Sequence, residues 1–465
     1  MGSGPTPGRR SDPEPTPAAA PGAGRSELRH AIPLAVAAAM VGLLNLLTTV
    51  FSAHVLSTRG YGTVIVLLSL FLVVATPAGS ALLVGVVRRV SAWESTGHLD
   101  RLRPWAARVH RIGEVSLVGL AVVMVLIRGP VASALSLPNA NGVAEMLVAG
   151  GVWVLVSIDR GLLQARRDYF DLSVNLVVEA VMRCALTVGL AAELGVEGAA
   201  LGVLVAELTT VTHARITSTR ALARPPAAPD PVEDAAELSV EAAGGTMPVT
   251  VHGGRDLAAD VLAALGSLLL LAVLQNADVI VLGARAPHHA GSYAAISVPS
   301  KALVFGALVL INYLLPEAAI RHQAGGHALR QLGYTFAVLA VPCIVLLGLA
   351  AAVPRHLLSA VFGRKLTEAS PAFSSLVVAM VLLSVTLVLS IYLLGIGWRW
   401  VIVVLAGGAG ALVAATWAAH GAYRTTAHAD LAVQAGLLAV LLVCFAVAHR
   451  HVVRRGPPAP EGAGG

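Results

Sequence analysis

Charged side chains are scarce in this 465-residue chain. Asp, Glu, Lys and Arg make up 12% of the residues, whereas 56% are hydrophobic, and the mean hydropathy is +0.78. A water-soluble domain of this length would expose far more charge, so the composition argues against a large soluble protein. Lysine is nearly absent, because only Lys301 and Lys365 accompany 30 arginines.

Several signatures of chemistry are also missing. The three cysteines, Cys184, Cys343 and Cys444, are far apart in apolar runs, which argues against a redox pair or a metal knuckle. No G-x-x-x-x-G-K-[ST] stretch occurs, so the chain lacks the phosphate-binding loop of ATPases. The pair His288-His289 has no acidic or cysteine neighbours, which disfavours a metal site. We therefore expect no cofactor and no enzymatic activity.

Long apolar segments dominate what remains. A membrane-spanning helix needs about 20 mostly apolar residues, and these segments do not show the alternation of membrane-spanning strands. The sequence therefore predicts an all-α polytopic membrane protein with about 12 transmembrane helices. We expect these at 31–55, 62–87, 109–128, 143–163, 171–193, 196–216, 257–283, 294–316, 333–353, 372–394, 398–419 and 429–450.

The distribution of basic residues predicts the orientation. If the N-terminus is cytoplasmic, 23 of the 32 basic residues fall in cytoplasmic segments and seven in outer ones. Cytoplasmic loops of membrane proteins are enriched in Arg and Lys, so both termini are predicted to be cytoplasmic. The net charge of +6 then reflects membrane orientation, and we expect the lipid bilayer, not nucleic acid, as the partner.

One long interruption separates the first six predicted spans from the last six. It is rich in Pro, Ala and acidic residues and has no recurring apolar face, as expected of a flexible linker. The equal division predicts two six-helix lobes with pseudo-twofold symmetry, an arrangement common in transporters. The expected units are a disordered tail (1–27), an N-terminal lobe (28–216), a cytoplasmic linker (217–256), a C-terminal lobe (257–451) and a second disordered tail (452–465).

A weak internal repeat supports this division. The turn before the second span contains Gly60, Tyr61 and Gly62, and the turn before the eighth contains Gly291 and Tyr293. Each lobe thus joins its first two helices through a tight turn with glycine and tyrosine. We expect the tyrosines to anchor these turns at the outer membrane interface, where aromatic rings are enriched.

Charged residues inside the predicted spans are the candidate site. Such residues are costly in a membrane and usually pair or line a water-filled path. Glu179 and Arg183 are four residues apart on one helical face and can pair, and Glu207 can pair with Arg183 or carry a proton. Asp278 and Lys301 lie at similar depths on successive spans and can form a gating pair or contact substrate.

Polar amides add to this set of candidates. Asn45, Asn175, Asn276 and Asn312 lie within predicted spans, where they can bond neighbouring helices or bind sugar hydroxyls. The substrate or cavity candidates are therefore Arg183, Lys301, Glu179, Glu207, Asp278 and Asn45.

Two segments carry a resemblance to a known family. The stretch 275–303 resembles the seventh-to-eighth helix region of the Wzx-type polysaccharide flippases, which belong to the multidrug/oligosaccharidyl-lipid/polysaccharide exporter superfamily. The matching residues in and after it are Asp278, Gly283, Gly291, Tyr293, Pro316 and Glu317, and Gly60, Tyr61 and Gly62 match the family's first turn.

This resemblance implies a specific activity. Such proteins move undecaprenyl-diphosphate-linked oligosaccharide from the inner to the outer leaflet of the bacterial plasma membrane, for cell-surface polysaccharide or lipopolysaccharide synthesis. Two lobes would rock about a central cavity, and Arg183 or Lys301 would hold the diphosphate. Polysaccharide synthesis or polymerisation proteins are further candidate partners. The resemblance transfers no substrate residue directly.

Other functions stay open. Multidrug/cation antiporters of the same superfamily also have twelve helices, and Glu179 or Glu207 could couple a cation. Lipid II flippases typically carry two further helices and an arginine-rich first lobe, whereas no basic residue lies within 31–55 or 62–87 here. A membrane-embedded glycosyltransferase or polymerase would need a large outer loop, and a scaffold for envelope assembly would not depend on the charged residues at all.

Overall fold

A computed structural model describes residues 23–138, 140–224, 254–304, 307, 328–352, 354–395, 398 and 400–455. Within these ranges all regular structure is helical and no strand occurs. The described part contains nine helices long and apolar enough to cross a membrane, or ten if the bent pair formed by α9 and α10 counts as one span. The predicted all-α polytopic fold is therefore confirmed.

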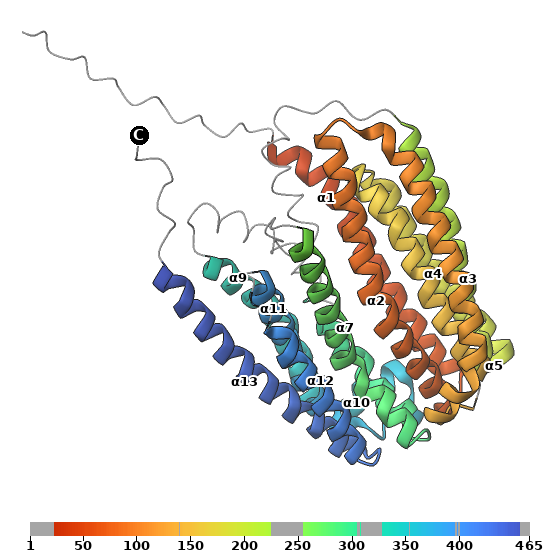
Figure 1. The fold of residues 1–465 in the computed structure, drawn as a ribbon. Helices are drawn as coiled ribbons and strands as arrows, with labels where there is room; N and C mark the ends of the chain where they lie inside the picture. The colour runs from red at the N-terminus through yellow and green to blue at the C-terminus, as the bar shows by residue number, and fades with distance from the viewer. Residues whose placement is uncertain are drawn as a thin grey trace, which may run out of the picture.

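The first five long helices form one side of the molecule, which we call the N-terminal lobe (Figure 1). In it, α4 packs against α2, α3 and α5, and α1 packs against α5. The elements are α1 (Ala23–Val55), α2 (Thr58–Ser95), η1 (Leu99–Arg101), α3 (Leu102–Ala134), α4 (Ala140–Ala165) and α5 (Tyr169–Ala223).

The 55-residue α5 consists of two arms that fold back on each other at Gly195. Gly195 has φ 64° and ψ −134°, a conformation that glycine adopts without strain. The arms pack closely, because a Cβ on Gly198 would lie 1.9 Å from the Leu190 carbonyl oxygen and one on Gly202 would lie 2.5 Å from that of Leu186. This hairpin supplies the predicted spans 171–193 and 196–216.

The remaining helices form the C-terminal lobe on the other side (Figure 1). Residues 290–304 are also helical, and α10 is bent by 99° relative to α9. The named elements are α7 (Gly254–Arg285), α9 (Ala328–Ala352), α10 (Pro354–Phe362), η2 (Arg364–Leu366), η3 (Ser370–Ala372), α11 (Phe373–Gly395), α12 (Val401–Ala418) and α13 (Tyr423–Arg455).

The two lobes meet at the end of the molecule where α2 begins and α7 ends, which we call the closed end (Figure 1). A Cβ on Gly62 would lie 2.4 Å from the Gly291 backbone nitrogen, and one on Gly291 would lie 2.0 Å from the Thr58 carbonyl oxygen. Along the same face, a Cβ on Gly283 would lie 2.4 Å from Val66. Away from this contact α2 and α7 diverge toward the end where α1 begins and α13 ends.

The prediction that the turn tyrosines anchor at the membrane interface is wrong. Tyr61 and Tyr293 are fully buried, with 0% of their surface exposed. The Tyr61 ring lies 6.4 Å from the ring of Phe362 in α10 of the opposite lobe. The turns face each other and not the lipid, so their aromatic rings fill the contact between the lobes.

Several helices extend beyond the predicted spans. α2 runs to Ser95, so Arg88 and Arg89 lie within the helix and not in a loop. α5 runs to Ala223 and α7 begins at Gly254, so both helices enter the range 217–256 predicted as linker. Residues 225–253 lie outside the described residues, as do most of the predicted tails, the second half of the predicted span 294–316, Asn312, Pro316 and Glu317.

The close contact between Gly62 and Gly291 predicts the effect of a larger side chain at this position. Gly291→Leu places a side chain against the Thr58 carbonyl, so we expect the lobes to move apart at the closed end. Spin labels at Arg59→Cys and His288→Cys, two exposed positions on the apposed turns, measure this as a longer interlabel distance. Gly407→Leu is the control, because nothing lies within 4 Å of a Cβ there. An unchanged distance in Gly291→Leu would contradict the described contact.

Candidate functional site

A buried network of opposite charges occupies the hairpin of α5. Glu179 and Arg183 are one turn apart on the first arm, and the fold-back at Gly195 places Glu207 of the second arm opposite them. Arg183 Nη2 donates hydrogen bonds to Oε1 of both Glu179 and Glu207. The expected pairing of all three residues is therefore present.

Arg160 of α4, which lies near the end of the predicted span 143–163, completes this network. Its Nε donates to Asn175 Oδ1 at 2.8 Å, and its Nη2 donates to Glu179 Oε2. Only 5% of Arg160 is exposed, because α4 continues to Ala165 and carries the guanidinium into the lobe. Asn175 Nδ2 in turn donates to the Thr210 carbonyl at 3.2 Å, which ties the two arms of α5 together.

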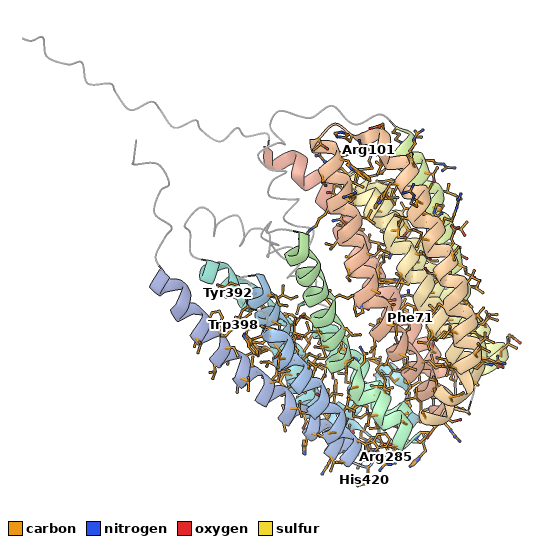
Figure 2. The ribbon with its side chains drawn as sticks, in the orientation of Figure 1. Phe71, Arg101, Arg285, Tyr392, Trp398 and His420 are labelled. Carbon is orange, nitrogen blue, oxygen red and sulfur yellow. The ribbon has the colours of Figure 1, made fainter. Side chains whose placement is uncertain are left out.

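The charges of this network balance. Two arginines, Arg160 and Arg183, face two carboxylates, Glu179 and Glu207, and such pairing is what makes buried charge tolerable. Arg183 is largely held in place: its Nη2 donates to both carboxylates, and its guanidinium lies over Phe71 of α2 (Figure 2), whose ring centroid is 5.7 Å from Cζ. Its buried Nε has no partner among the described residues. Arg183 is therefore bound mainly by the carboxylates of its own lobe.

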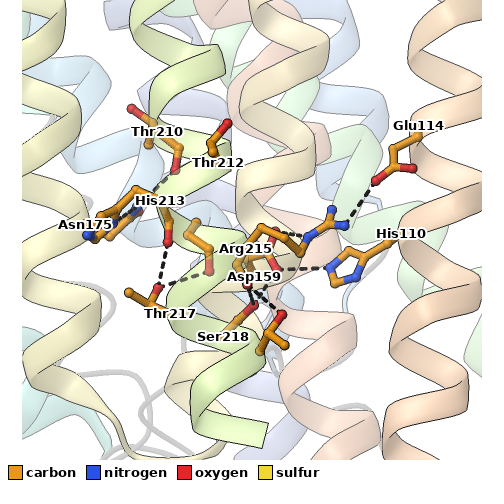
Figure 3. Close-up of polar contacts among 12 residues, drawn as sticks. His110, Glu114, Asp159, Asn175, Thr210, Thr212, His213, Arg215, Thr217 and Ser218 are labelled. Atoms are coloured by element: carbon orange, nitrogen blue, oxygen red, sulfur yellow. Dashed lines mark hydrogen bonds and ion pairs between the residues drawn. The ribbon is translucent and has the colours of Figure 1, made fainter.

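A second polar cluster lies in the same lobe beside the first (Figure 3). The fully buried Asp159 accepts from Ser218 Oγ at 2.7 Å and from Arg215 Nε at 3.3 Å, and His110 Nε2 lies 3.0 Å from it. Arg215 also bonds Glu114 Oε1 at 3.0 Å. This cluster joins α3, α4 and α5, and the sequence did not predict it because Arg215 lies at the very end of the predicted span 196–216.

The C-terminal lobe holds the other predicted pair. Lys301 Nζ donates to Asp278 Oδ1 at 3.2 Å, and Ser297 Oγ lies 3.4 Å from Asp278 Oδ2. Asp278 is fully buried and Lys301 is 7% exposed. The expected ion pair between α7 and the helix that follows it is therefore present.

Asp430 of α13 adds a second carboxylate, which the sequence analysis did not single out. It is fully buried and accepts from Gln434 Nε2 at 3.1 Å, while no partner for its Oδ2 occurs among the described residues. Asp430 stands beside the start of the predicted span 429–450, where sequence alone does not show burial. Its spacing from Gln434, four residues later on one helical face, is the sequence signal that could identify it.

Asn45 belongs to none of these polar clusters. It is exposed on α1, and its backbone carbonyl accepts from Thr49 Oγ1 at 2.9 Å. Within the described ranges, no group of three or more His, Cys, Asp or Glu side chains could hold a metal ion.

Comparison with known proteins identifies the architecture. No family model and no curated protein matches the chain. Among solved structures, an inward-facing multidrug resistance MATE family transporter of the MOP superfamily matches with a TM-score of 0.64 at 12% identity, over 88% of this chain and 96% of that one. The lipid II flippase MurJ in an inward closed conformation matches with a TM-score of 0.64 at 9% identity, over 89% and 87%.

This chain has the fold of the MOP-superfamily transporters. An outward-facing MATE transporter of that superfamily matches with a lower TM-score, 0.56, at 13% identity over 94% of this chain and 97% of that one. At these identities the similarity concerns the fold, while the substrate has to be argued from the residues of this chain.

The charge balance of the N-terminal network predicts its response to substitution. Arg183→Ala leaves Glu207 buried without a cation, so we expect a loss of roughly 3 kcal/mol in the free energy of unfolding. The double variant Arg183→Met/Glu207→Gln removes both charges and should cost less than Arg183→Ala alone. Denaturant titration in detergent measures both variants. A double variant less stable than Arg183→Ala would show that the pairing of these two charges is not what makes their burial tolerable.

Proposed function

We propose that this protein is a transporter that moves polyprenyl-diphosphate-linked oligosaccharide from the inner to the outer leaflet by alternating access of its two lobes. The observation that carries the proposal is the contact at one end alone: Gly62 and Gly291 bring the turns of the two lobes together, while α2 and α7 diverge at the other end. With both termini cytoplasmic, as the arginine distribution predicts, the divergent end faces the cytoplasm.

The ion pairs within each lobe support rigid-body motion of the lobes. Every ion pair described above joins residues of the same lobe: Arg160, Glu179, Arg183 and Glu207 in one, Asp278 and Lys301 in the other. Opening the closed end therefore breaks no buried ion pair of these two sets. Rocking of two such bodies presents the space between them to each side of the membrane in turn.

The substrate class follows from the resemblance at Gly60–Gly62 and 275–303 and from physical need. A diphosphate and a sugar chain cannot cross hydrocarbon unaided, whereas a polyprenyl tail can remain in lipid. A lipid II flippase shares the fold. Arg88 and Arg89 lie within α2, so the second helix carries basic residues, and their absence from 62–87 does not disfavour a lipid-diphosphate substrate of that kind.

A second candidate, the multidrug/cation antiporter, is favoured by Asp430. In the C-terminal lobe Lys301 pairs with Asp278, while Oδ2 of the buried Asp430 has no partner among the described residues. An unbalanced carboxylate in a membrane is expected to bind a proton or a cation. Such a group can couple transport of either substrate class to an ion gradient.

Reconstitution distinguishes the two candidates. The protein is placed in vesicles with a polyprenyl-diphosphate oligosaccharide that carries a fluorophore on its sugar, and a membrane-impermeant reductant is added outside. We expect the inner-leaflet fluorescence to become reducible only in vesicles that contain the protein. If it stays protected while the same vesicles move a cationic dye against a proton or sodium gradient, the antiporter assignment replaces the flippase.

The basic candidates are tested in the same assay. We expect Arg183→Ala and Lys301→Ala each to slow flipping, because each leaves buried carboxylates without their cation. Flipping at the wild-type rate in both variants would remove these residues from the transport mechanism.

The role of the Asp430 carboxylate in ion coupling is tested separately. Asp430→Asn keeps the size and the hydrogen bond to Gln434 but cannot bind a proton or cation, so we expect ion-driven transport to fall by about tenfold or more, equivalent to ~1.4 kcal/mol. Glu193→Gln, an exposed carboxylate near the tip of α5, is the control and should transport normally. Full gradient-driven transport in Asp430→Asn would show that the coupling ion binds elsewhere.

A further inference from the structure

Lys365 reaches from the C-terminal lobe to the N-terminal lobe at the closed end. It lies in η2, between α10 and α11, and its Nζ donates to the Leu56 carbonyl at 2.7 Å and approaches the His54 carbonyl at 3.5 Å. α1 ends at Val55, so these carbonyls lie at its C-terminus. The last carbonyls of a helix lack intrahelical donors and carry the negative end of the helix dipole, which favours a cation there.

Lys365 differs from its neighbour Arg364 in its partner. Both residues of η2 are exposed, but Arg364 has no side-chain partner among the described residues, whereas the Lys365 ammonium is bound to the opposite lobe. The bond stands next to the packing of Tyr61 on Phe362 and the contact of Gly62 with Gly291. These neighbouring contacts are apolar or steric, so Lys365 adds a directional, charge-assisted bond to them.

We propose that Lys365 is a positioning residue for transport: it caps the C-terminus of α1 across the lobe contact and holds the closed end shut until the lobes rock apart. This inference rests on the alternating access of the proposed function, although it does not depend on which substrate is moved. Opening the closed end separates η2 from α1, so the bond forms and breaks once in each cycle. Its strength then sets the proportion of molecules closed at this end.

The test measures that proportion without any substrate. In a background with Cys184, Cys343 and Cys444 replaced by alanine, spin labels at Arg59→Cys and His288→Cys report the separation of the apposed turns in lipid nanodiscs. We expect Lys365→Ala to raise the ratio of open to closed distances about tenfold, because charged hydrogen bonds are the stronger class. Lys365→Arg, which keeps a cationic donor, should restore most of the closed population.

Arg364→Ala is the matched control, since it removes the same charge one residue away, and Gly291→Leu shows that the labels detect separation. Equal shifts in Lys365→Ala and Arg364→Ala would overturn the proposal, because charge at this end alone would then be responsible. No shift in Lys365→Ala, with a shift in Gly291→Leu, would overturn it as well. Because no substrate is present, a failure of the oligosaccharide assay leaves this result interpretable, and the two failures are distinguishable.

Discussion

Backbone-to-backbone approach at Gly62 and Gly291 is the constraint on which the arrangement of the lobes depends. Within a bilayer, helices gain no hydrophobic free energy by leaving lipid for each other, so close contact requires small residues and bonds between polar groups. A side chain on either glycine would meet backbone atoms of the opposite lobe. The contact buries Tyr61 and Tyr293, and it brings Lys365 onto the end of α1.

Buried charged side chains form ion pairs within each lobe. The network centred on Arg183 ties both arms of α5 to α4, and the pair of Asp278 and Lys301 joins α7 to the following helix. Breaking such pairs in hydrocarbon is expensive, which makes each lobe stiff. Among the described residues, the lobe contact consists of close glycine approach, aliphatic and aromatic packing and the bonds of Lys365, and it contains no ion pair. The surface that the proposed alternating access has to open therefore holds none of the buried ion pairs.

Much of this could be predicted from the sequence, because hydropathy and helical spacing act locally. The all-helical membrane fold, the Glu179–Arg183 pair and the Asp278–Lys301 pair follow from such patterns, and the described residues contain them. Arg160 and Asp430 were missed because they stand near helix ends, where burial depends on the neighbouring helices and not on local composition. Which lobe surfaces face each other likewise lies outside local patterns, so the turn tyrosines were placed in the wrong environment.

Joining the two turns tests the central claim most directly. Cysteines at Arg59 and His288, linked by a bifunctional thiol reagent that a reductant cleaves, hold the closed end shut in reconstituted protein. If the lobes must separate there, transport stops on cross-linking and returns on cleavage, while either single cysteine treated in the same way transports normally. Cross-linked protein that transports at the uncross-linked rate would contradict alternating access through this contact.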